Sequence, residues 1–135
     1  KYATSGSGQL IIEDNSTLDV GAQIRRETSI NSGALTYKQR GGTVTVGNTA
    51  APTTERGVFE ILNAGSEFTY TGGDLIIARS QLTTKPALYL DPETYTLSGG
   101  ATITIGNANT PADDTIGIFT SIPLKNIYNK LLITY

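Results

Sequence analysis

The stretch Gly41-Gly42-Thr43-Val44-Thr45-Val46-Gly47 returns nearly unchanged as Gly99-Gly100-Ala101-Thr102-Ile103-Thr104-Ile105-Gly106. A third pair of glycines, Gly72-Gly73, precedes Leu75-Ile76-Ile77. In the first two copies threonine alternates with a branched aliphatic residue, which is the period of a β-strand with one buried face. The repeat therefore predicts a chain built from copies of one strand-based unit.

Each pair of glycines also follows a short alternating segment: Leu35-Thr36-Tyr37, Phe68-Thr69-Tyr70 or Tyr95-Thr96-Leu97. Further upstream an apolar segment ends in a turn signal, as in Ile61-Leu62-Asn63-Ala64-Gly65 and Leu88-Tyr89-Leu90-Asp91-Pro92. The unit thus reads strand, turn, strand, Gly-Gly, strand, loop. Three short strands leave an apolar edge that one unit cannot cover, so the units are expected to stack.

We therefore predict an all-β fold, a parallel β-helix (solenoid) of about four to five coils with loops inserted at one corner. A repeat region over residues 1–121 would hold coils near residues 10–26, 28–47, 58–79 and 87–106. Residues 122–135 would form a last partial coil, a cap or the lead-in to a further domain. The alternative is an antiparallel β-sandwich, in which the Gly-Gly pairs are hairpin turns.

The expected core consists of rows of side chains stacked from coil to coil. The rows predicted are Leu35 with Phe68 and Tyr95, and Tyr37 with Tyr70 and Leu97. Equivalent points of successive coils are expected at Ile12, Ile30, Ile61, Leu90 and Ile122. The threonines between the apolar residues would point outward, and each strand would be about three residues long.

Extra residues collect after the third strand of a unit, at residues 48–56, 79–86 and 107–115. Insertions at one corner project from one side of a solenoid, which favours that side for binding, although such loops are also tolerated without a ligand. The candidate binding residues of this side are Tyr89, Asn48, Asn107, Asn109, Asp113 and Asp114. Tyr89 stands between Leu88 and Leu90 and should point outward, for contact with a ligand or for burial under a loop.

Composition excludes several classes of function. The chain has no His, Cys, Met or Trp, which excludes His-based acid–base catalysis, thiol nucleophiles, Cys/His zinc sites and haem or iron–sulfur ligation. A net charge of −2 with 16% charged residues does not favour nucleic acid as a partner. Purely apolar runs are too short to span a membrane. We expect no cofactor and no metal, and we expect the chain to be an excerpt of a longer protein.

The segments at residues 41–47 and 98–106 resemble the repeats of secreted right-handed parallel β-helix proteins, especially very large surface adhesins of gliding and related Bacteroidota. This resemblance implies an extracellular, cell-surface stalk or adhesive segment, with surface glycans or other cell-surface and secretion components as partners. Asp114-Thr115-Ile116 resembles the short O-glycosylation acceptor of that phylum, which would make Thr115 a modification site; a plain loop is the alternative.

The same style of sequence occurs in autotransporter passengers, phage fibres and polysaccharide-active β-helices, so an enzyme must be weighed. Glycoside hydrolases need two carboxyl groups at a defined separation. Asp113-Asp114 resembles the paired Asp of polygalacturonases, but the His-Gly element of those enzymes cannot exist in this chain. We therefore predict a non-catalytic protein. The alternatives are a polysaccharide lyase or hydrolase whose catalytic residues lie partly outside this segment, and a phage- or autotransporter-type fibre.

Overall fold

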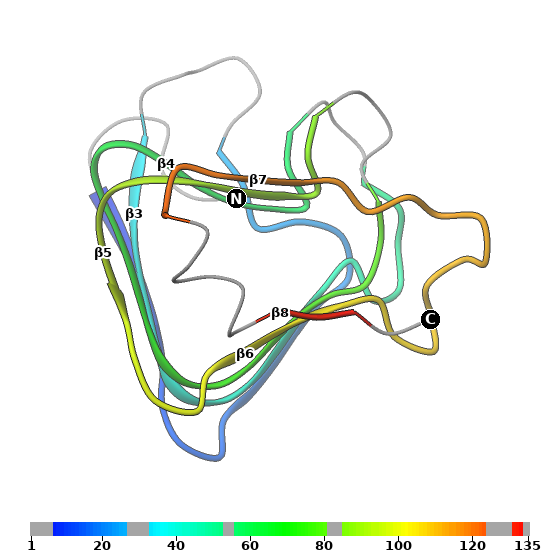
Figure 1. Ribbon diagram of the computed structural model, residues 1–135, viewed down its shortest axis with the longest axis horizontal. Helices are drawn as coiled ribbons and strands as arrows, with labels where there is room; N and C mark the ends of the chain where they lie inside the picture. Colours follow the sequence, from blue (N-terminus) through cyan, green and yellow to red (C-terminus); the bar gives the residue numbers. More distant parts are fainter. Residues whose placement is uncertain (1–6, 27–32, 53–55, 81–84, 124–130, 134–135) are drawn as a thin grey trace.

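The computed structural model describes residues 7–26, 33–52, 56–80, 85–123 and 131–133, and these contain strands but no helix (Figure 1). The strands are β1 (Ser7–Ile12), β2 (Thr17–Val20), β3 (Ala34–Val46), β4 (Phe59–Ile77), β5 (Leu88–Leu97), β6 (Thr102–Ile105), β7 (Ile118–Thr120) and β8 (Leu131–Ile133). All strand pairs among the described residues are parallel. The predicted β-solenoid is confirmed, with about four coils, and the antiparallel alternative is wrong.

The coils trace three sides of a triangle (Figure 1). The first side stacks β1, residues 34–39 of β3, 67–70 of β4 and 94–97 of β5. The second side stacks β2, residues 43–46 of β3, 74–77 of β4, β6 and β8. The third side stacks residues 59–63 of β4, 88–92 of β5 and β7, and Ile24 adds a bridge to Phe59.

The Gly-Gly pairs form the corner between the first and second sides. Gly42 and Gly73 have positive φ angles of 67° and 81°, a conformation that side chains disfavour. A Cβ on Gly73 would also collide with the backbone of Gly41 and Gly42 in the preceding coil. The glycines therefore turn the chain while keeping adjacent coils in contact. Because the strand continues through this corner, β3 has 13 residues and β4 has 19, and the expected three-residue strands are wrong.

Pairing along the first side corrects the predicted rows. Phe68 pairs with Tyr37 rather than Leu35, and Tyr70 pairs with Gln39 rather than Tyr37. The predicted pairings of Phe68 with Tyr95 and of Tyr70 with Leu97 are confirmed. The error arises because the glycine corner fixes the register, and Tyr37, Phe68 and Tyr95 all precede their first glycine by the same number of residues.

Tyr95 was expected in the core, and this is wrong: it is 41% exposed. Its strand is the last layer of the first side among the described residues, so no further described strand covers the other face of the ring. Ile61 and Leu90 are equivalent as predicted, but Leu90 pairs with Thr120 and not with Ile122. Ile12 lies on the first side, whereas Ile61 lies on the third. Ile30 lies outside the described residues.

The inserted loops join the second side to the third, as predicted for a single corner. Each begins at a small residue of one column: Gly47 donates its N–H to Val20, Ala78 to Val46 and Gly106 to Ile77, over 2.9 to 3.0 Å. These bonds extend the second-side ladder to the point where the loops leave it. In the described part of the chain no helix is long and apolar enough to cross a membrane.

Candidate functional site

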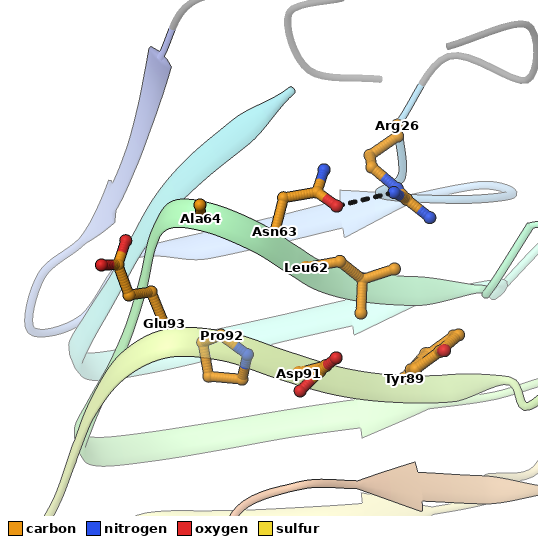
Figure 2. Close-up of a pocket in the computed structure, with 8 residues that line it drawn as sticks. All are labelled: Arg26, Leu62, Asn63, Ala64, Tyr89, Asp91, Pro92 and Glu93. Carbon is orange, nitrogen blue, oxygen red and sulfur yellow. Dashed lines mark hydrogen bonds between the residues drawn. The ribbon is translucent and has the colours of Figure 1, made fainter. Parts of the chain in front are cut away.

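An open groove of about 430 Å³ lies on the outer surface where the third side turns into the first. We call it the Tyr89 groove. Figure 2 shows its lining: Tyr89, Asp91, Pro92 and Glu93 along β5, Leu62, Asn63 and Ala64 along β4, and Arg26 from the first coil. Leu62 is paired with Asp91 and Asn63 with Pro92, so neighbouring coils contribute facing residues.

Arg26 is held in the groove wall by Glu60. The Arg26 guanidinium Nε donates to Glu60 Oε1 over 3.2 Å, and the Arg26 backbone N–H donates to the same oxygen over 2.7 Å. Glu60 is only 1% exposed, although it points outward between buried Phe59 and Ile61. Its other carboxylate oxygen accepts the Gly57 N–H over 3.2 Å. A buried carboxylate needs such partners, so Glu60 and Arg26 fix each other.

Asn63 connects this ion pair to the corner. Its Oδ1 accepts Arg26 Nη1 over 2.9 Å (Figure 2), and its Nδ2 donates to the Gly33 carbonyl over 2.7 Å. The residue has a φ of 86°, a left-handed conformation that asparagine tolerates better than most residues. Asn63 therefore turns the chain and positions the Arg26 guanidinium at once.

The Tyr89 ring forms the aromatic part of the groove. Its neighbours Leu88 and Leu90 are fully buried, and Tyr89 points outward, as predicted. Its ring meets that of Phe119, in the next coil, edge to face at a centroid distance of 4.9 Å. Phe119 is 47% exposed, so the two rings form an aromatic patch on the third side.

Two carboxylates complete the groove. Asp91 and Glu93 are exposed, and Pro92 between them is buried. One oxygen of Glu93 accepts the Gly65 N–H, and the Glu93 N–H donates to Ser66 Oγ over 3.3 Å, which ties β5 to the corner of β4. An aromatic ring beside carboxylates, an amide and a guanidinium can hold a ligand that has both apolar faces and hydroxyl or amine groups.

The asparagines predicted as binding residues meet at the loop-bearing corner. Asn48 Oδ1 accepts Asn107 Nδ2 over 3.1 Å and Asn109 Nδ2 over 2.8 Å. Asn48 Nδ2 donates to Asp19 over 2.9 Å. The four side chains come from three coils, with Asn107 and Asn109 in the same loop, and the hydrogen bonds among them brace these coils against one another.

Asp114 and Thr115 line a cavity of about 500 Å³ beneath the last inserted loop. Ile105, Pro111, Ala112, Ile116 and Ile118 supply most of its apolar lining. Asp114 accepts the Ser80 N–H over 3.0 Å and so anchors the loop. Asp113 is exposed and Thr115 is exposed. Asn107 and Asp114 are the predicted binding residues that line this cavity, whereas Tyr89 lies in the separate Tyr89 groove.

Four lining residues of the Tyr89 groove escaped sequence reasoning: Arg26, Asn63, Asp91 and Glu93. Asn63 and Asp91 stood in the turn signals of two successive coils, one residue out of register, and stacking those signals would have placed them close together. No sequence pattern predicts the position of Arg26, because it is set by the hydrogen bonds that Arg26 donates to the buried Glu60 of another coil. Among the described residues, no group of three or more acidic side chains could hold a metal ion.

Comparison with family models, with curated proteins and with solved structures finds no match to the chain. Function must therefore be inferred from the residues that the fold brings together. The Tyr89 groove is the hollow in which aromatic, acidic, basic and amide groups meet.

Proposed function

We propose that the chain is a non-catalytic structural and adhesive segment of an extracellular cell-surface protein, and that its Tyr89 groove contacts surface glycans. The observation that carries the proposal is the meeting of Tyr89 and Asp91 of β5 with Asn63 of the paired strand β4 and with Arg26 of the first coil. The extracellular setting rests on the composition and on the resemblance to surface adhesins.

The groove suits a sugar for chemical reasons. The C–H face of a pyranose is apolar and packs on an aromatic ring, while its hydroxyl groups need donors and acceptors at the edge of that ring. Tyr89 supplies the ring, the Asp91 and Glu93 carboxylates can accept hydrogen bonds from hydroxyl groups, and Asn63 also lines the groove. The residues stand on paired strands, so little conformational freedom is lost on binding.

The solenoid suits a structural role because each coil packs only on its neighbours. Such a stack lengthens by addition of coils and keeps its outer sides in register. The second side shows this register: Val20, Val46, Ile77 and Ile105 occupy one column through four successive coils. A groove on one side would therefore be held at a fixed orientation along a rigid stalk.

The proposal is tested by screening the chain on a glycan array and measuring the hits by calorimetry. Tyr89→Ala should weaken binding at least tenfold, since it removes the aromatic platform. The matched control is Tyr95→Ala, which removes an exposed tyrosine of the first side, and it should leave binding unchanged. Absence of glycan binding, or equal effects of the two variants, would refute the proposal; circular dichroism checks that both fold.

A second candidate, a glycoside hydrolase, is favoured by one observation. Asp91 and Glu93 are two residues apart in β5, which places their Cα atoms roughly 7 Å apart. Side chains that leave one face of a strand from such positions can bring their carboxyl groups to the separation of about 5 to 9.5 Å that hydrolases use. Incubation with the bound glycans and an assay for new reducing ends decides between the candidates. Turnover that Asp91→Asn abolishes would replace the non-catalytic proposal.

A further inference from the structure

The charges of the Tyr89 groove are unbalanced. The charged residues in its lining are two carboxylates, Asp91 and Glu93, and one guanidinium, that of Arg26. Asp91 and Glu93 are exposed, whereas Arg26 is 8% exposed and lies in the wall. A ligand therefore meets negative charge first, although a guanidinium in a sugar site commonly suggests an acidic sugar.

Arg26 does not offset these carboxylates, because its own counter-charge is the buried Glu60. Arg26 Nε is 3.2 Å from Glu60 Oε1, and the side chains are 10% and 1% exposed. Arg26 Nη1 is engaged by Asn63 over 2.9 Å. An acidic ligand would have to compete with Glu60 and Asn63 for this guanidinium while approaching Asp91 and Glu93.

We infer that the Tyr89 groove selects saccharides that carry a free, positively charged amine, such as de-N-acetylated amino sugars, over neutral and acidic ones. The inference rests on the proposed glycan contact and adds the class of ligand. The ammonium group would lie between the Tyr89 ring and the Asp91 carboxylate. The ring attracts a cation through its negative face, and the carboxylate accepts a charge-assisted hydrogen bond.

Three ligands of equal length test the inference: a glucosamine hexamer, its fully N-acetylated counterpart and a hexagalacturonate. The first two share one backbone and differ in the amine alone. We expect the glucosamine hexamer to bind roughly three- to thirty-fold more tightly than the N-acetylated hexamer, and the galacturonate to bind most weakly. The preference should shrink as salt is added, because exposed charges are screened.

Variants assign the preference to the groove. Asp91→Asn should reduce the preference for the free amine while Tyr89→Ala reduces binding of both hexamers. The matched control is Asp113→Asn, which neutralises an exposed acid that is not part of the groove lining, and it should leave the preference intact.

The outcomes separate this inference from the proposed function. Equal binding of the two hexamers, with Tyr89 required, refutes the amine selectivity but leaves the glycan contact in place. Absence of binding to any saccharide refutes both. Equally tight binding of a lysine hexapeptide shows that charge and not a sugar is recognised, and also overturns the inference.

Discussion

Tyr37 and Phe68 stack in successive coils, with their ring centroids 5.7 Å apart and their planes 19° from parallel. They pair directly in the first-side ladder, and both are fully buried. Phe59, from the third side, closes the group by meeting the Tyr37 ring edge to face at 5.0 Å. Residues from two sides of the triangle thus share one aromatic centre, which joins the sides through the interior.

Removing a ring from this aromatic centre should lower the free energy of unfolding more than removing the Tyr95 ring from the last layer of the first side. Phe68→Ala leaves a cavity among fully buried neighbours and should lower the free energy of unfolding by about 3 to 5 kcal/mol. Tyr95→Ala, one pairing further on, removes a ring that is 41% exposed and should cost under about 1.5 kcal/mol. Urea denaturation followed by circular dichroism measures both. Equal losses would contradict the described centre.

The glycine corner makes a sharper comparison. Gly73→Ala places a Cβ against the backbone of Gly41 and Gly42 at a positive φ, so we expect a loss of about 2 kcal/mol or more. Gly100 is the second glycine of its own pair, and a Cβ there meets nothing within 4 Å. In that pair Gly99 takes the positive φ of 58° instead. Gly100→Ala should therefore be neutral within about 0.5 kcal/mol by thermal or urea unfolding.

The buried ion pair Arg26–Glu60 and the exposed ion pair Arg40–Glu13 should differ in how much stability is lost when the carboxylate is neutralised. Glu60→Gln leaves the Arg26 guanidinium in the groove wall without its counter-charge and should cost about 3 kcal/mol. Glu13→Gln removes the partner of Arg40 in a pair whose side chains are 57% and 49% exposed, and should cost under about 1 kcal/mol. Chemical denaturation at low and high salt tests this. Salt should affect the second pair more.

Stability should fall in alkaline solution because of two buried tyrosines. Burial raises the pKa of Tyr37 well above its ordinary value, and burial likewise raises the pKa of Tyr70. Their contribution is fully present below the pKa of an unfolded tyrosine, near 10, and is lost as pH rises above it, because the unfolded chain then releases the protons.

At pH 11, ionisation of each of these tyrosines in the unfolded chain should lower the free energy of unfolding by about 1.4 kcal/mol relative to pH 8. The control is the double variant Tyr37→Phe/Tyr70→Phe, which should lose less stability over the same range even if it starts lower. It also loses the hydrogen bonds to Gln39 Oε1 and the Gly73 carbonyl. Parallel pH profiles for the two proteins would argue against the assignment to Tyr37 and Tyr70.

Much of the fold was predictable because the repeat is a local signal. Alternation in Thr43-Val44-Thr45-Val46 predicted which residues face inward, and all inward residues of this segment are buried. The register was harder. The register follows from the glycine corner, where the backbones of adjacent coils are in close contact. The predicted rows instead aligned the first residues of the apolar segments, which paired Phe68 with Leu35 and not with Tyr37.

The candidate site was only partly predictable. Tyr89 could be assigned to the outer surface from its apolar neighbours, since alternation needs one strand alone. The partners of Tyr89 come from other coils, and Arg26 depends on a buried Glu60 that alternation places outside. Gln39 is a similar case: it occupies an inward position because the Tyr37 hydroxyl and the Gly42 and Asp74 carbonyls satisfy its amide.

The sequence by itself determined an all-β solenoid, the corners of its coils and the side that carries the inserted loops. These features depend on strand period and on glycine, which act within a few residues. Only the tertiary structure decided which residues of different coils stand beside one another, and hence the aromatic centre, the Arg26–Glu60 pair and the groove. Such contacts depend on register between coils, and a shift of two residues preserves the alternation while changing every neighbour.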